Sequence, residues 1–342
     1  MPIALPATRE ASPRYAIFGK LPRRADFVRV GTDHSAATEF SELLGKSLAL
    51  AGSQPDWRVR AAADASDFQM TSRDGRWRLA GVLMPSHDEA GRIYPLVAGV
   101  VLPAQAGAAC APEFIIANEL FFSGLAEQLA SAVENAVDLI ACRQFFETWI
   151  APNPHASDDI ALAAQILARH MDETLASNWR TVLAGADAGD IDDWLLPFLF
   201  HARAPRARCA PILLPLSEAP GEDRLDEAAW LALLCTAMGN GRTPDFITVK
   251  RGEKRHLAVP PGRLDEKFLA AALWGATTGT PGAGGEALRQ PPERAAIAFD
   301  LARQLQDPAL TLASLQTVLE RLAHELATGA TPQNTLPFPF TD

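Results

Sequence analysis

The first hundred residues of the chain contain short apolar runs separated by turn residues, a pattern that is typical of β-strands. The Asp74-Gly75 pair between two such runs predicts a hairpin, and Gly19 with the following Leu21-Pro22 ends the first run. The strands predicted in this part of the chain cover residues 14–19, 67–71, 76–84 and 93–102.

Apolar residues at helical spacing dominate the remaining sequence. Between the first two strands, residues 36–50 place Phe40, Leu43 and Leu44 on one face of a helix. The other predicted helices cover residues 113–150 (broken once), 158–183, 191–200, 226–238, 264–274 and 310–327, with two further strands at 210–216 and 246–250. Strands that share a chain with long covering helices predict a layered α/β architecture, here of two units that meet near residues 140–160.

Composition describes an ordinary globular protein, because 48% of the residues are hydrophobic and 21% are charged. The formal net charge of −10 makes the chain a poor general binder of nucleic acid and of anionic membrane surfaces. We therefore expect no nucleic-acid partner. A basic segment stands out at its N-terminal end, with Arg14, Lys20, Arg23, Arg24 and Arg29. This segment predicts either one oriented contact surface or a solvated turn.

The sequence also bears on the compartment. The cysteines Cys110, Cys142, Cys209 and Cys235 are far apart, which predicts buried free thiols in a reducing environment. Residues 1–14 contain prolines where a signal peptide needs a continuous apolar core. Because the longest apolar runs fall far below the ~20 residues of a membrane-spanning helix, we expect a cytoplasmic protein with no direct membrane insertion.

Common catalytic and cofactor motifs are missing from the sequence. It has no P-loop, no dinucleotide-binding glycine motif and no nucleophile elbow. Ser86-His87-Asp88 contains the residue types of a catalytic triad, but adjacent residues cannot orient one another in those roles. The aspartates of residues 187–193 lack the glycine and the glutamate of a calcium loop, and the histidines lack zinc-ligand spacing. We therefore expect that the protein is not an enzyme and that it binds no metal and no cofactor.

Two blocks of residues carry a family resemblance. The first is Phe18-Gly19-Lys20-Leu21-Pro22 followed by Asp26-Phe27-Val28-Arg29. The second runs through Trp77-Arg78, Gly81-Val82-Leu83-Met84-Pro85-Ser86, Asp88, Gly91-Arg92 and Tyr94-Pro95-Leu96. In this order the blocks resemble the signature of the TagF family, accessory proteins of bacterial type VI secretion. The chain departs from the family pattern at Ala25, where a glycine is usual, and in the shortened segment 51–66.

The resemblance implies an α/β three-layer sandwich with a mixed or antiparallel sheet in an N-terminal domain, residues 1–145. A mostly helical α/β domain would follow over residues 146–342, with a flexible connection at 276–292, which is rich in Gly, Pro, Thr and Ala. It further implies a post-translational repressor of type VI secretion that binds a cytoplasmic FHA-domain component, with other cytoplasmic components as further candidate partners. Two alternatives stay open: a phosphoprotein-directed hydrolase whose site escapes motif searches, and a structural scaffold of the apparatus.

Both blocks contain a loop rich in turn residues and charge next to a strand end. We expect Gly19 and Pro22 to shape the first loop while Phe18 and Phe27 anchor it, which leaves the cations facing outward. The candidate partner-binding residues are Lys20, Arg23, Arg24, Asp26, Arg29, Ser86, Asp88 and Arg92. The alternative is that both loops match the family only because the fold needs these turns.

Overall fold

The structure of the protein is a computed structural model. It describes residues 14–52, 64–104, 111–135, 157–174, 212–217, 221–238, 243–251, 254–260 and 262–275, together with residues 317 and 320. Among these residues, no helix has the length and apolar character needed to cross a bilayer.

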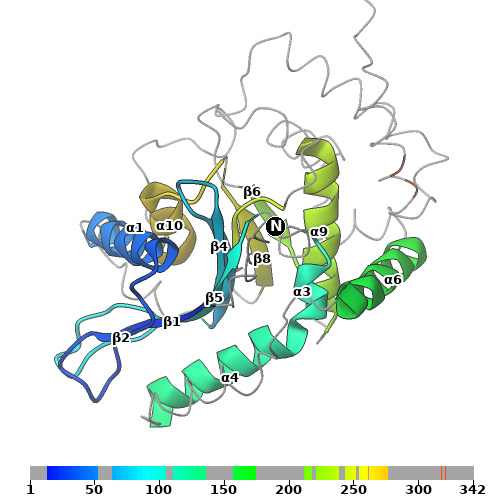
Figure 1. The fold of residues 1–342 in the computed structure, drawn as a ribbon. Coiled ribbons are helices and arrows are strands. Elements are labelled where there is room, and N and C mark those ends of the chain that lie inside the picture. Colours follow the sequence, from blue (N-terminus) through cyan, green and yellow to red (C-terminus); the bar gives the residue numbers. More distant parts are fainter. Residues whose placement is uncertain are drawn as a thin grey trace, which may run out of the picture.

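One eight-stranded sheet forms the centre of the described part (Figure 1), and all of its paired strands are antiparallel. Its strand order is β2-β1-β5-β4-β3-β7-β8-β6. The strands are β1 (Arg14–Gly19), β2 (Val28–Val30), β3 (Ser66–Thr71), β4 (Trp77–Met84), β5 (Leu96–Pro103), β6 (Ile212–Pro215), β7 (Phe246–Arg251) and β8 (Lys254–Val259).

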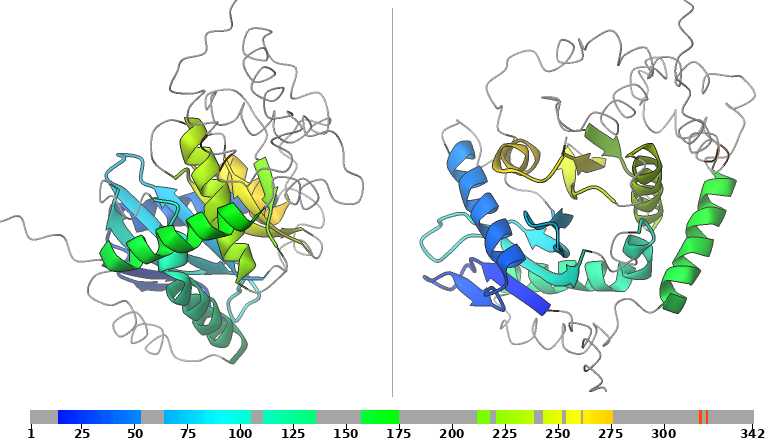
Figure 2. Two further views of the ribbon diagram at one scale, coloured as in Figure 1. Left: turned by 90° about the vertical axis from the view of Figure 1, so that its right-hand side faces the viewer. Right: turned by 45° about the horizontal axis from the view of Figure 1, so that its top comes forward.

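Helices cover both faces of the sheet, which makes three layers (Figures 1 and 2). On one face lie α1 (Ser35–Ala51) and α10 (Glu266–Trp274). On the other lie α3 (Phe114–Ala117), α4 (Glu119–Asn135) and α9 (Glu222–Met238), with α6 (Ser157–Glu173) packed outside α3 and α9. This arrangement confirms the predicted α/β class.

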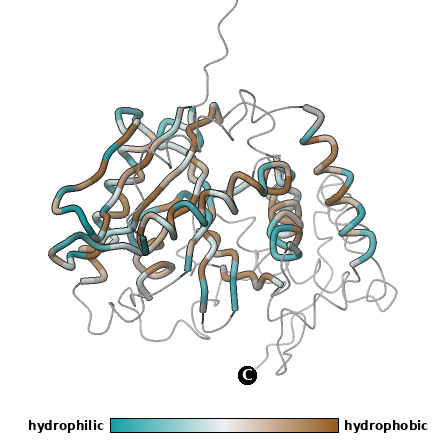
Figure 3. Tube along the Cα trace, turned by 90° about the horizontal axis from the view of Figure 1, so that it is seen from below, coloured by the Kyte–Doolittle hydropathy of each residue, from teal (hydrophilic) through white to brown (hydrophobic). Residues whose placement is uncertain are grey.

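The double covering explains why the central strands β4 and β5 are mostly apolar. Along β4, Leu79 and Leu83 enter the core under α1 and α10, while Ala80 and Val82 enter the core under α4. A strand with both faces buried has no solvent-facing side, so its sequence does not alternate between apolar and polar residues. In Figure 3 hydrophilic segments occur at the loops and on parts of the helices.

Most predicted elements in the described residues are confirmed, including the hairpin at Asp74-Gly75 and the break in the helix that follows residue 113. The strands β2 and β8 were not predicted. β2 has only three residues, and β8 begins with the polar residues Lys254 and Arg255. The predicted helices at 191–200 and 310–327 and the connection at 276–292 lie outside the described residues, apart from residues 317 and 320.

The sheet runs across the predicted boundary between residues 145 and 146, because β3 pairs with β7. The division into two domains stays a prediction, but strands from both sides of it belong to one sheet. Of the four cysteines, only Cys235 lies in the described residues, where it is buried and forms no disulfide, as predicted.

Candidate functional site

The first loop begins at Gly19, whose backbone no other residue could adopt without strain. Its φ angle is +136°, and an added Cβ would lie 2.2 Å from the carbonyl oxygen of Pro95. The preceding Phe18 is fully buried and meets the ring of Phe40 edge-on, with ring centroids 6.4 Å apart. Gly19 therefore lets β1 end directly against the start of β5, where the second loop returns to the sheet.

A buried carboxylate, Asp88, joins the two loops. Lys20 Nζ donates to Asp88 Oδ2 at 2.8 Å, and Arg92 Nε donates to the same oxygen at 2.7 Å. The other oxygen, Oδ1, accepts from the backbone N–H of Arg92 at 2.8 Å. The Asp88 side chain is 0% exposed, whereas the side chain of Arg92 is 65% exposed. We call Lys20, Asp88 and Arg92 the Asp88 clamp.

Hydrogen bonds to main-chain atoms tie the same loops together beside the clamp. Ser86 Oγ donates to the carbonyl of Lys20 at 2.6 Å, and Arg92 Nη2 donates to the carbonyl of Ala25 at 3.2 Å. The backbone N–H of Glu89 donates to the carbonyl of Arg24 at 3.2 Å. The 19–27 and 85–92 loops therefore form one unit although the sequence separates them by about 60 residues.

The Asp88 carboxyl is ionised at neutral pH. The hydrogen bond from Lys20 holds the pKa of Asp88 well below its usual range, and the bonds from Arg92 act in the same direction, whereas desolvation opposes them. One carboxylate thus balances two cations, and a net positive charge is left at this end of the sheet.

The remaining charges of the first loop and of strand β2 are on the surface. Arg23, Arg24, Asp26 and Arg29 are all exposed. The Arg29 guanidinium lies 5.1 Å from the centre of the Phe27 ring, and that ring meets Tyr94 edge-on at 4.8 Å. The Arg29 side chain therefore packs on an aromatic pair, which limits its rotamers.

The structure thus divides the predicted site residues into two groups. Ser86 and Asp88 are buried and connect the loops, so they act on the surface only through the residues that they hold. The expectation that Lys20 faces outward is wrong, because its side chain is only 15% exposed and its ammonium group is bound to Asp88. Whether the exposed group, Arg23, Arg24, Asp26 and Arg29 with the outer part of Arg92, binds a partner stays a prediction.

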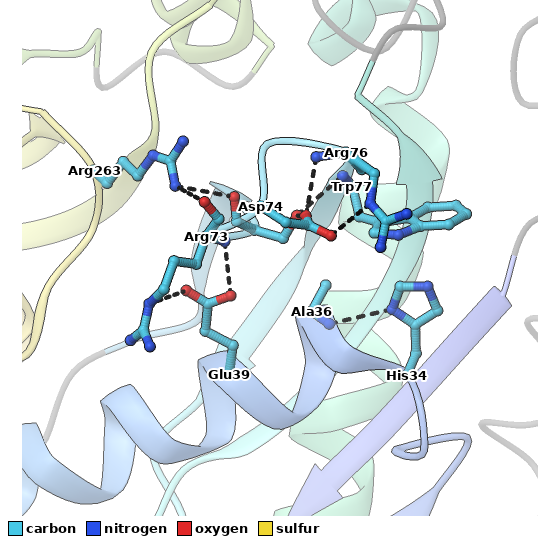
Figure 4. Close-up of polar contacts among 9 residues, drawn as sticks. His34, Ala36, Glu39, Arg73, Asp74, Arg76, Trp77 and Arg263 are labelled. Carbon is cyan, nitrogen blue, oxygen red and sulfur yellow. Dashed lines mark hydrogen bonds and ion pairs between the residues drawn. The ribbon is translucent and has the colours of Figure 1, made fainter.

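A second polar cluster lies at the opposite end of the β3–β4 hairpin (Figure 4). Glu39 of α1 accepts from the Arg73 backbone N–H at 2.8 Å, and Arg263 donates to the carbonyl of Ser72 at 3.3 Å. Asp74 pairs with the exposed Arg76 at 2.7 Å within the turn. These contacts fix the hairpin tip to α1 and to the segment before α10.

Across the described residues, no group of three or more His, Cys, Asp or Glu side chains could hold a metal ion.

One comparison with known proteins agrees with the two motif blocks. Residues 16–148 match the family model described as "TagF N-terminal domain, Type VI secretion system-associated". The solved structure of PA0076 from Pseudomonas aeruginosa PAO1 is 16% identical, with a TM-score of 0.37, and the match covers 78% of this chain and 97% of that one. No curated protein matches. Residues 16–148, which contain both motif blocks, therefore match the TagF N-terminal domain family, which is associated with type VI secretion.

Proposed function

We propose that this chain is a cytoplasmic repressor of type VI secretion that binds an FHA-domain component of the apparatus and acts by occupancy, without catalysis. The family match supports the association with type VI secretion. Repression and the FHA-domain partner are what the resemblance to this family suggests for this chain.

One observation carries the location of the binding surface: the two motif blocks come together around Asp88 and present exposed arginines. Arg23, Arg24 and Arg29 lie within the span of the first block, residues 18–29, and Arg92 belongs to the second block. The exposed acidic residues beside them are Asp26 and Glu89. A surface with this excess of cations on a chain of net charge −10 fits a partner with an acidic surface.

The clamp makes such a surface better suited to binding. Ordering a loop on association costs free energy, and a loop that is already fixed avoids most of this cost. Here the main chain is held at Lys20, Arg24 and Ala25 by hydrogen bonds from the second loop. Preorganised arginines at the rim of an interface act mostly on the association rate and its dependence on salt.

The test is a charge reversal, Arg23→Glu with Arg24→Glu, followed by titration calorimetry against the FHA-domain protein of the same secretion system. We expect the Kd to rise at least about tenfold, which corresponds to ~1.4 kcal/mol, with an unchanged melting temperature. The matched control is Arg73→Glu with Arg76→Glu, which reverses two exposed charges at the opposite end of β4. Equal affinities of the two double variants would contradict the proposed surface.

A further inference from the structure

The eight-stranded sheet has a weak joint between β3 and β7. Only Phe68 with Ile247 and Gln69 with Phe246 are paired there, whereas β4 and β5 are paired along their whole length from Trp77 to Met84. Side chains replace the missing ladder: Thr248 Oγ1 accepts from the backbone N–H of Asp67 at 2.8 Å. We call this joint, with the side chains that bridge it, the β3–β7 seam.

A buried ionic cluster lies at one end of the seam. Arg224 of α9 binds Asp67 of β3 at 2.6 Å, and its guanidinium lies 5.3 Å from the centre of the Phe122 ring of α4. Arg255 of β8 contacts Asp67 at 3.3 Å and also binds Asp223 of α9. Asp67 therefore holds two guanidinium groups, both of which come from beyond the predicted domain boundary.

Glu227 completes this cluster in an unfavourable position. It is 1% exposed, and its Oε2 accepts from Arg224 at 3.2 Å, a longer contact than the one Arg224 makes with Asp67. Its Oε1 has no hydrogen-bond partner within the described part of the chain. The groups that act on it are Arg224 and Asp223 from α9, Asp67 from β3 and Arg255 from β8. On the same helix, Asp226 is engaged elsewhere, by His170 of α6 and the backbone N–H of Ser217.

Two guanidinium groups thus face three carboxyl groups, one of which is fully buried with a lone oxygen. A carboxylate in that position shares two guanidinium groups with two other carboxylates and leaves one buried oxygen without a hydrogen bond, which is costly, whereas a neutral carboxylic acid carries no charge there. We propose that Glu227 carries a proton in the folded protein and that this proton keeps the β3–β7 seam closed. Loss of the proton adds a third negative charge beside Asp67 and Asp223, which opposes the contacts of α9 with β3.

The direction of titration agrees with this geometry. Burial raises the pKa of Glu227 to about 8, and the attraction of Arg224 offsets only part of the shift. An unfolded chain releases the same proton at about pH 4.3. The folded state binds the proton more tightly than the unfolded chain does. The stabilisation that the protonated Glu227 contributes to folding therefore falls as the pH rises above about 4.3, and it is lost once the pH passes about 8.

Infrared spectroscopy of the full chain tests the protonation directly. We expect a protonated-carboxyl C=O band at about pH 6.5 that disappears by about pH 9, and that is absent from Glu227→Gln. The matched control is Glu222→Gln on the exposed face of the same helix, which should keep the band. A spectrum of Glu227→Gln that equals the wild-type spectrum would overturn the proposal.

Hydrogen exchange tests the effect on the seam. After correction for intrinsic exchange rates, the amides of β3 and β7 in the wild type should lose protection between about pH 6.5 and pH 9. The same amides in Glu227→Gln should keep their protection. The amides of β4 and β5 serve as the internal reference. If Glu227→Gln fails to fold, Asp223→Asn removes one neighbouring negative charge and should shift loss of the infrared band to lower pH. An unshifted band in Asp223→Asn, or equal seam protection at both pH values in the wild type, would overturn the proposal.

Discussion

Replacing Gly19 with alanine tests the idea that the two loops depend on the close approach of β1 to Pro95. The φ angle of +136° is one that L-residues rarely adopt, and the new Cβ would lie 2.2 Å from the Pro95 carbonyl oxygen and 2.7 Å from Leu96 Cα. Both neighbours are main-chain atoms, so no flexible side chain can move aside. Either β1 or the segment that follows the Asp88 clamp must shift.

The expected loss of stability in Gly19→Ala is the sum of two separable costs. Backbone strain at a positive φ angle costs roughly 1–2 kcal/mol, and forcing extra atoms into a packed site costs roughly 1–3 kcal/mol more. Gly19→Ala should therefore lower the free energy of unfolding by about 3 kcal/mol. Gly91→Ala separates the two costs, because Gly91 has a φ angle of +74° but nothing within 4 Å of the added Cβ. We expect a loss of only about 1 kcal/mol there.

Urea unfolding measures both values, since a change in midpoint at a constant m-value reports a change in stability. Equal losses in Gly19→Ala and Gly91→Ala would show that the approach to Pro95 does not matter. The reasoning that Gly19 positions the two loops would then be refuted.

Two further predictions concern single contacts. Asp88→Asn removes a carboxylate whose pKa is lowered by Lys20. The free energy of unfolding should therefore be lower than that of the wild type at neutral pH, and this difference should shrink as the pH falls below about 3.9. Urea unfolding at about pH 7 and pH 3 measures the difference. Thr248→Val removes the acceptor of the Asp67 backbone N–H at the seam and should cost about 1–3 kcal/mol in the same assay, whereas an unchanged midpoint would mean that this bond contributes nothing.

The sequence predicted the elements whose patterns are set locally. Strand β4 and helix α1 follow from apolar periodicity, and the hairpin follows from Asp74-Gly75. Strand β2 was missed because its three residues obtain their conformation by pairing with Ile17, Phe18 and Gly19. Such pairing is a tertiary effect, and no pattern of three residues can show it.

The candidate site shows the same limit. The sequence indicated that residues 18–29 and 85–92 matter, but an outward orientation for Lys20 was wrong because its partner, Asp88, lies 68 positions away. A lysine next to a loop glycine carries no local sign of burial. The charges of α9 gave no signal either: Arg224 and Glu227 fit a solvated helix start in the sequence, and only the packing of α9 on β3 shows that they are buried.

The extent of the family match and the extent of the fold differ, and this difference decides how the protein has to be tested. The match ends at residue 148, yet the sheet continues from β3 into β7, β8 and β6. Both cores combine residues from either side of that limit: Val82 with Trp230 on one face, and Phe68 with Ile247 on the other. A fragment that ended at residue 148 would leave the seam edge of β3 unpaired and Asp67 without Arg224 and Arg255. An unpaired edge and an uncompensated carboxylate favour misfolding and self-association. Partner binding at the arginine surface is therefore a property to measure on the whole chain, where the sheet that supports both loops is complete.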